Sequence, residues 1–247
     1  MPILRYRLLF VGVNAVPGGP PLRAARRDAD AMSRRFAGWG YDQRARHRVL
    51  LGDDATSERV LDELTLASSA APLDLLLFYW AGHLDTEGRK PSLVTADGGV
   101  ALSEVAGRLT TTAARQTVLV IDACHAQSAG PWLTALAGAH RAGRSFAAFA
   151  AGGTTPMSRE DLRRGYFTGA LLEQLPRYTR GVPPDIDLIK AFEASAELSR
   201  VRRREQPVIV VEGAATFRLA PAKARTLPFE RRAREGRQPA RLIAASA

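Results

Sequence analysis

Apolar residues follow two alternating patterns along the chain. Short, nearly continuous apolar runs with aromatic and β-branched members, such as LDLLLFYW at 73–80 and TVLVI at 117–121, are typical of strands covered on both faces. Between these runs lie segments in which apolar residues recur every three or four positions, as on one face of a helix. The alternation predicts an α/β fold, with helices on both faces of a mostly parallel sheet.

The two patterns assign elements to most of the first 219 residues. Strands are predicted at 6–13, 48–51, 73–80, 117–121, 145–151 and 207–211. Helices are predicted at 23–37, 56–70, 103–109, 166–175 and 186–198, with a small hairpin over 90–100. Beyond Phe217, prolines interrupt a segment rich in Arg and Ala, which predicts one domain over 1–219 and a mobile basic tail or linker over 220–247.

Length and cysteine content fit a folded domain without covalent staples. A chain of 247 residues can bury roughly 70 to 75 per cent of its unfolded surface in one core. Cys124 is the only cysteine, which excludes an internal disulfide and suits a reducing compartment. The apolar stretch near the N-terminus is short and is predicted to be a strand, and no run approaches the roughly 18 residues that cross a bilayer. We therefore expect a cytoplasmic protein that does not bind membranes.

The charge of the chain first suggests nucleic-acid binding. The formal net charge is +10, and all but three of the 35 Lys and Arg residues are Arg. Half of the excess lies in 220–247, which holds seven basic and two acidic residues. Because only 7% of residues are aromatic and no recognition motif is present, we expect nucleic-acid binding only non-specifically, through the tail. The Arg content is equally explained by the coding bias of a GC-rich genome.

Two predicted strands lead into reactive side chains. The strand at 73–80 runs into Ala-Gly-His83, and the strand at 117–121 runs into Asp122-Ala-Cys124-His125. Carboxyl ends of parallel strands share one edge of a sheet, so His83 and Cys124 would emerge together if the strands are neighbours. A thiol needs such a base to become a good nucleophile. The pair predicts acyl transfer, with Cys124 attacking a carbonyl and His83 protonating the leaving amine.

These residues also have interpretations other than catalysis. A lone Cys after a buried strand usually packs as a small apolar side chain, and a lone His is usually a loop residue. Their occurrence at equivalent strand ends favours catalysis, with His125 the second candidate for the partner of Cys124. A metal site is disfavoured, because no carboxylate or second cysteine lies at ligand spacing.

At these two turns the chain resembles the caspase-like cysteine peptidases, which include caspases, metacaspases, paracaspases and bacterial relatives. Their marks are a strand leading to Gly-His and another leading to Asp-x-Cys-His, here FYWAGH at 78–83 and VLVIDACH at 118–125. The Asp28-Ala29 pair, GYFTGALL at 165–172 and Gln206-Pro207 extend the likeness over about 5–219. The resemblance implies a three-layer α/β sandwich with a mostly parallel central sheet of about six strands.

The resemblance also implies roles for individual residues. Cys124 would be the nucleophile and His83 the general acid/base. The backbone N–H groups of Cys124 and Leu84 would form the oxyanion hole, although the family usually has Gly at position 84. In relatives that cleave after Arg or Lys, the positions of Asp28 and Asp122 supply an acidic pocket, so we expect cleavage after Arg and less often Lys. The alternative is that Asp28 caps or pairs on its own helix, and that Asp122 orders its loop.

The implied setting is a regulated endopeptidase in bacterial stress or anti-phage defence. Its partners would be a protein or peptide substrate and an activating protein. No cofactor is expected, and calcium activation, known in many metacaspases, is left open. Two other functions compete: a caspase-like pseudoenzyme that acts as an interaction module, suggested by Leu84, and an Arg-rich nucleic-acid-binding domain.

Overall fold

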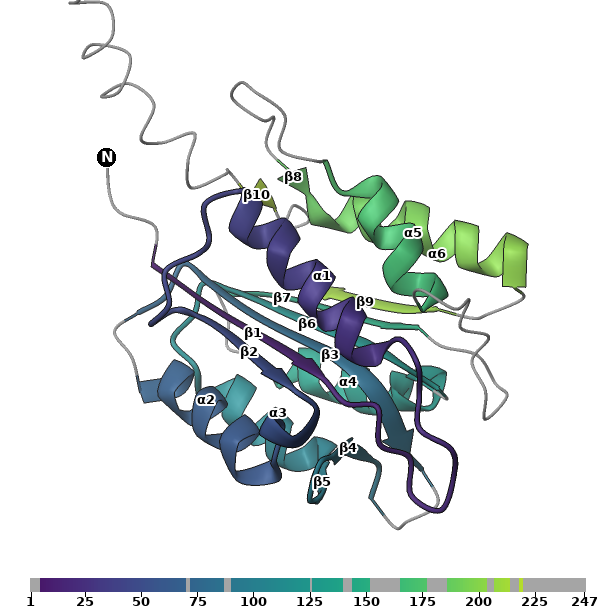
Figure 1. Cartoon of the computed structure of the whole chain (residues 1–247). Coiled ribbons are helices and arrows are strands. Elements are labelled where there is room, and N and C mark those ends of the chain that lie inside the picture. Colours follow the sequence, from purple (N-terminus) through teal and green to yellow (C-terminus); the bar gives the residue numbers. More distant parts are fainter. Residues whose placement is uncertain are drawn as a thin grey trace, which may run out of the picture.

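A central sheet of mostly parallel strands organises the chain (Figure 1). The computed structural model describes residues 5–69, 72–86, 90–124, 126–139, 144–151, 165–176, 186–203, 207–213 and 218–219. The predicted tail over 220–247 lies outside these residues.

The strands occur in the order β2-β1-β3-β6-β7-β9 across the sheet. Their bounds are β1 Tyr6–Gly12, β2 His47–Leu51, β3 Leu75–Asp85, β6 Gln116–Cys124, β7 Ser145–Ala151 and β9 Val208–Glu212. Only β9 runs antiparallel to its neighbour on this path. The hairpin of β4 (Ser92–Thr95) and β5 (Gly98–Ala101) extends from the end of β3, and β8 (Ile186–Asp187) pairs separately with β10 (Arg218–Leu219).

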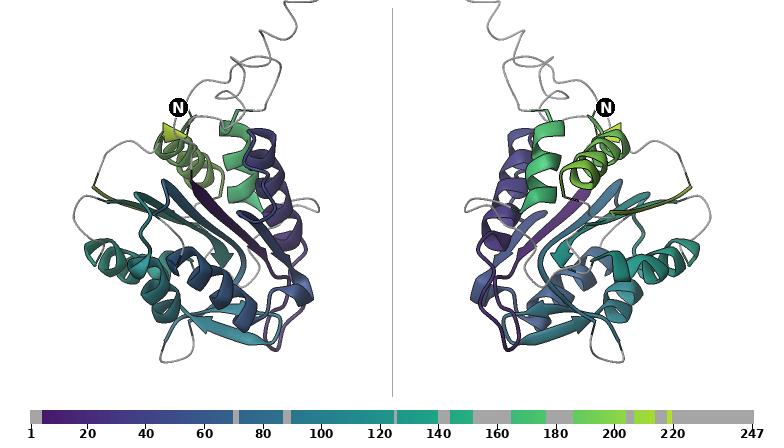
Figure 2. Two further views of the ribbon diagram at one scale, coloured as in Figure 1. Left: turned by 90° about the vertical axis from the view of Figure 1, so that its left-hand side faces the viewer. Right: turned by 90° about the vertical axis from the view of Figure 1, so that its right-hand side faces the viewer.

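Helices cover both faces of the sheet, as Figures 1 and 2 show. One layer consists of α1 (Ala25–Gly38), α5 (Tyr166–Gln174) and α6 (Leu188–Arg203), and we call the sheet face beneath it the α1 face. The opposite layer consists of α2 (Ser57–Ser69), α3 (Leu102–Thr111) and α4 (Gly130–Gly138), over the α2 face. Two short 3₁₀ turns, η1 (Gly52–Asp54) and η2 (Ala126–Ala129), complete the described elements. The predicted α/β fold with a mostly parallel, helix-covered sheet is thereby confirmed.

Alternation along the strands divides the core between these faces. In β1, Leu8 and Phe10 pack on the α1 face, whereas Leu9 and Val11 pack on the α2 face. All four side chains are buried, which explains why the strand has a continuous apolar sequence rather than an alternating one.

Several predicted bounds were wrong. β3 continues through Gly82 to Asp85, and β6 continues to Cys124, so the residues interpreted as turns lie within strands. Helix α4 was not predicted at all, and residues 186–187 form β8 instead of starting a helix. β3 is longer because its residues up to His83 pair with β6, and Leu84 and Asp85 pair with β4, contacts that local signals such as Gly82 do not reveal.

A glycine allows α1 to approach the end of β1. A Cβ atom on Gly12 would lie 2.7 Å from the carbonyl oxygen of Ala25 and 2.8 Å from the Cβ of Ala29. Both distances are too short for non-bonded heavy atoms, so Gly12 permits a helix position that any other residue would prevent. The close approach sets the first turn of α1, which carries Asp28, against the sheet.

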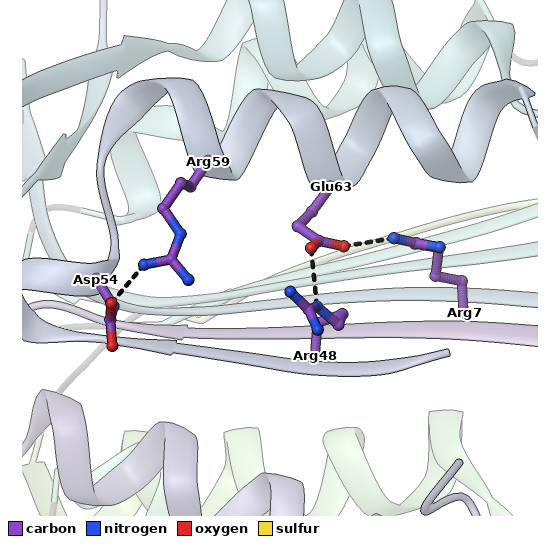
Figure 3. A network of polar contacts seen from close by, with 5 residues as sticks. All are labelled: Arg7, Arg48, Asp54, Arg59 and Glu63. Atoms are coloured by element: carbon purple, nitrogen blue, oxygen red, sulfur yellow. Dashed lines mark hydrogen bonds and ion pairs between the residues drawn. The ribbon is translucent and has the colours of Figure 1, made fainter. Parts of the chain in front are cut away.

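An ion cluster around the buried Glu63 fixes α2 to the opposite face (Figure 3). Glu63 of α2 accepts hydrogen bonds from Arg7 of β1 and, at 2.8 Å, from Arg48 of β2. Glu63 is only 9% exposed, so the two guanidinium groups compensate a charge that would be costly to bury alone. The cluster joins two strands to one helix and belongs to the scaffold rather than to the site described below.

His47, at the start of β2, joins α1 to the sheet. Its Nε2 atom lies 2.6 Å from the hydroxyl of buried Ser33, its Nδ1 atom contacts the carbonyl oxygen of Tyr41, and its ring packs against Phe10. Burial lowers the pKa of His47 from its ordinary value of 6.5. This effect is larger than that of the hydrogen bond to Tyr41, which raises the pKa. The folded protein therefore keeps this imidazole neutral where the unfolded chain binds a proton.

The free energy of unfolding is expected to fall as the pH decreases from 6.5 through the lower pKa of folded His47. The unfolded chain takes up the proton first, so acid favours unfolding, and above pH 6.5 this effect is absent. Urea unfolding on either side of that pH measures the effect. The variant His47→Gln should flatten the pH dependence in this window, and an unchanged slope would refute the assignment.

Candidate active site

His83 and Cys124 lie opposite each other at the end of two adjacent strands. β3 and β6 pair in parallel over nine positions, and the last pair in their register is His83 with Cys124. Neighbouring strands run roughly 4.8 Å apart, so the backbone alone brings the two predicted catalytic residues together. The condition set by the sequence, that the two strands be neighbours, is met. His125, the alternative partner, lies outside the described residues.

Leu84 lies within β3, opposite Leu93 of β4, and its side chain is 1% exposed. An extended backbone suits leucine as well as glycine, so a strand at this point removes the need for glycine. The side chain is accommodated in the core of the α2 face, because β3 continues into the hairpin. This departure from the family pattern is therefore compatible with an unstrained backbone after His83.

Asp28 and Asp122 converge although they belong to different elements. Asp28 lies in the first turn of α1 and is 2% exposed, and Asp122 lies in β6, two residues before Cys124. A Cβ atom built on Gly165 would meet Asp28 Oδ2 at 2.8 Å and Asp122 Oδ2 at 3.3 Å. The two carboxylates thus flank one backbone position, and only glycine fits there without displacing them.

Both carboxylates bind the N-terminus of α5. The backbone N–H of Gly165 donates to Asp28 Oδ2 at 2.8 Å, and the N–H of Thr168 donates to Asp122 Oδ2 at 3.2 Å. Carboxylates are favourable at this end of a helix, where N–H groups lack partners within the helix. Asp28 therefore reaches across to α5, a contact that its position in the sequence did not predict.

Two hydroxyl groups extend this arrangement into the core. The hydroxyl of Thr168 donates to Asp122 Oδ2 at 2.5 Å, and the phenol oxygen of Tyr79 lies 2.5 Å from Thr168 Oγ1. Burial, together with the nearby carboxylates of Asp122 and Asp28, raises the pKa of Tyr79 well above its ordinary value of 10.0. Tyr79 keeps its proton, and because the Thr168 proton points to a carboxylate, Tyr79 donates to Thr168.

Sequence reasoning missed Tyr79 and Thr168. Tyr79 occurs in a buried strand, where an aromatic residue needs no functional explanation. Thr168 belongs to the GYFTGALL segment, and that segment was the only signal in the sequence that pointed to it.

The described residues offer no membrane-spanning helix and no metal cluster. None of their helices combines the length and apolar character needed to span a membrane. No group of three or more His, Cys, Asp or Glu side chains among them could hold a metal ion.

Comparison with known proteins places the chain in a family. A sequence model of the caspase domain matches residues 5–210. The chain belongs to the caspase family of peptidases. No curated protein matches it significantly.

Solved structures show the caspase fold independently. A protein from Geobacter sulfurreducens is 18% identical, with a TM-score of 0.60 over 85% of this chain and 94% of its own. The Drosophila initiator caspase Dronc is 14% identical, with a TM-score of 0.60 over 89% and 84% of the two chains. Caspase-1 from Spodoptera frugiperda is 17% identical, with a TM-score of 0.53 over 84% and 86%. The TM-scores establish the shared fold, and at such low identities they establish the fold alone.

Proposed function

We propose that this caspase-family chain is a cysteine endopeptidase that cleaves peptide bonds after Arg and, less often, Lys. The observation that carries the proposal is the register of β3 and β6, which sets His83 opposite Cys124. Acyl transfer needs a thiolate and a proton carrier within reach of the same scissile bond. The ends of two adjacent strands provide both positions.

In the proposed reaction, the Cys124 thiolate attacks the carbonyl carbon of the scissile bond. His83 then protonates the amine as the C–N bond breaks, which leaves the acyl group on sulfur. Water attacks this thioester with His83 as the base, and the acid product leaves as the thiol is restored. The backbone N–H groups of Cys124 and Leu84 stabilise the negative oxygen in both steps.

The preference for a basic residue rests on Asp28 and Asp122. Two carboxylates that flank one backbone position repel each other, and the N-terminus of α5 supplies only partial positive charge. A cationic side chain from the substrate relieves that repulsion. Arg is the better match, because its planar guanidinium binds two carboxylate groups at once, whereas Lys presents a point charge.

A panel of fluorogenic peptides that differ only at P1, the residue before the scissile bond, tests the proposal. We expect kcat/KM to be highest with Arg, lower with Lys, and near the background with Asp or Ala. Faster cleavage after Asp than after Arg would refute the assignment of the two carboxylates.

Leu84, where the family usually has Gly, favours a second candidate, a pseudoenzyme that binds partners. An Arg-bearing electrophile distinguishes the two functions, because it labels only a reactive thiolate beside a pocket for Arg. Cys124 is the only cysteine, so one added mass locates the label. A chain that stays unlabelled and does not cleave the panel would favour the pseudoenzyme over a peptidase that is active without its partner.

The proposal extends to the cellular role. The resemblance to bacterial caspase-like proteins supports a regulated cytoplasmic protease in stress or anti-phage defence that is switched on by a partner protein. The proposed reaction needs no cofactor, because Cys124 and His83 supply both the nucleophile and the proton.

A further inference from the structure

Asp122 ends a chain of hydrogen bonds that begins in the core. The Tyr79 phenol donates to Thr168 Oγ1, and the Thr168 hydroxyl donates to Asp122 Oδ2, each over 2.5 Å. The N–H of Thr168 donates to the same Oδ2 atom at 3.2 Å. Two donors from one residue therefore hold one oxygen of the carboxylate, which also sets the direction of the other oxygen.

Burial strengthens this series of hydrogen bonds. Tyr79 and Thr168 are both 0% exposed, so water has no access to replace a lost donor. Hydrogen bonds in such surroundings are electrostatically stronger than in water, and successive donors polarise one another. A missing hydroxyl in this chain leaves a buried oxygen without its donor, which is costly.

The helix that carries Thr168 is also held at its other end. Arg35 of α1 donates to the carbonyl oxygen of Leu172 at 2.9 Å. The indole N–H of Trp39, the residue after α1, donates to the carbonyl oxygen of Pro176 at 3.1 Å. Since Asp28 binds Gly165, α1 holds α5 at both ends. Thr168 thus projects from a fixed helix, and its hydroxyl has a defined position relative to Asp122.

We infer that Thr168 and Tyr79 are positioning residues that orient the Asp122 carboxylate and thereby set the preference for arginine over lysine at P1. The inference rests on the proposed function, which assigns Asp122 to the P1 pocket. A guanidinium donates along fixed directions, so its affinity depends on where the carboxylate oxygens point. A lysine ammonium rotates freely and tolerates a carboxylate that has turned.

The variants separate orientation from folding. Thr168→Val keeps the shape and the backbone N–H but loses the hydroxyl, Thr168→Ser restores the hydroxyl, and Tyr79→Phe removes only the first donor. Thr134→Val is the matched control, because Thr134 is an exposed helical threonine in α4 that donates to the Gly130 carbonyl at 3.0 Å. All are made in the Cys124→Ala background, so that peptides bind without being cleaved.

Isothermal titration with two peptides that differ only in Arg or Lys at P1 then measures the pocket directly. We expect Thr168→Val to lower the Arg-to-Lys affinity ratio about tenfold, and Tyr79→Phe to lower it less, about threefold. Thr168→Ser and Thr134→Val should keep the ratio within about twofold of the parent. Thermal denaturation checks folding, and if Thr168→Val does not fold, Thr168→Ser and Tyr79→Phe decide the outcome.

The outcomes distinguish this inference from the proposed function. Equal losses of affinity for both peptides would make Thr168 and Tyr79 structural and refute the inference, while the P1 preference of the parent stays intact. A parent that binds neither basic peptide would refute the pocket itself, and the inference with it. A lowered ratio that serine restores supports both.

Discussion

Replacing Cys124 with alanine is expected to lower kcat/KM for the P1 arginine peptide by at least about 10⁴-fold while the protein stays folded. Alanine removes the sulfur that forms the acyl intermediate and leaves backbone groups that give only weak residual catalysis. Initial rates with the fluorogenic peptide, compared with thermal denaturation of the same samples, measure the two effects separately.

Two histidine variants sharpen this test. His83→Ala removes the proposed proton carrier. We expect kcat/KM to fall by about 10² to 10⁴-fold, mainly through a lower kcat. His47→Gln is the matched control, since His47 starts β2 at the opposite end of the sheet from the carboxyl ends of the strands. It should alter stability and keep the activity of the folded enzyme. Hydrolysis that persists in Cys124→Ala would contradict the mechanism.

The positions of His83 and Cys124 were predictable because they depend on local signals. Buried parallel strands have continuous apolar sequences, and their ends mark one edge of the sheet. The pairing of β3 with β6 then needed only the assumption that successive buried strands are neighbours. The lengths of these strands were not predictable, because pairing between β3 and β6 continues to His83 and Cys124, and pairing with β4 extends β3 to Asp85.

Helix α4 was missed for a different reason. Its sequence GPWLTALAG places Leu133, Leu136 and Ala137 against the core, but glycine and alanine elsewhere give little contrast between its faces. Pro131 in the first turn is a helix-start signal that was available in the sequence. The amphipathic pattern, on which the other helices were predicted, fails in a short helix of small residues.

The contacts of Asp28 and Asp122 lie beyond sequence reasoning of this kind. Their convergence on Gly165 and Thr168 depends on how α5 packs against α1 and β6. Helical spacing predicts which face of α5 is buried, but it does not predict which atoms meet across the interface. The resemblance to a family paired the two carboxylates, and their hydrogen-bond partners came from the structure.

Asp28→Asn is expected to lower kcat/KM for the P1 arginine peptide about 100-fold without destabilising the fold. The side-chain oxygen of Asn still accepts the Gly165 N–H, so the contact with α5 persists while the negative charge disappears. Because Asp28 is 2% exposed, its charge is little screened, and a substrate guanidinium loses a strong partner.

The same substitution should maintain or increase the free energy of unfolding, because it removes one of two neighbouring negative charges. Activity then falls without a loss of stability, which a purely structural role for Asp28 would not produce. Asp30→Asn is the matched control on the same helix: Asp30 forms an exposed ion pair with Arg34 at 2.6 Å, and its loss should change kcat/KM by less than about twofold. If Asp28→Asn unfolds the protein, or if both variants lose activity equally, Asp28 serves the scaffold and the preference for arginine must arise from other residues.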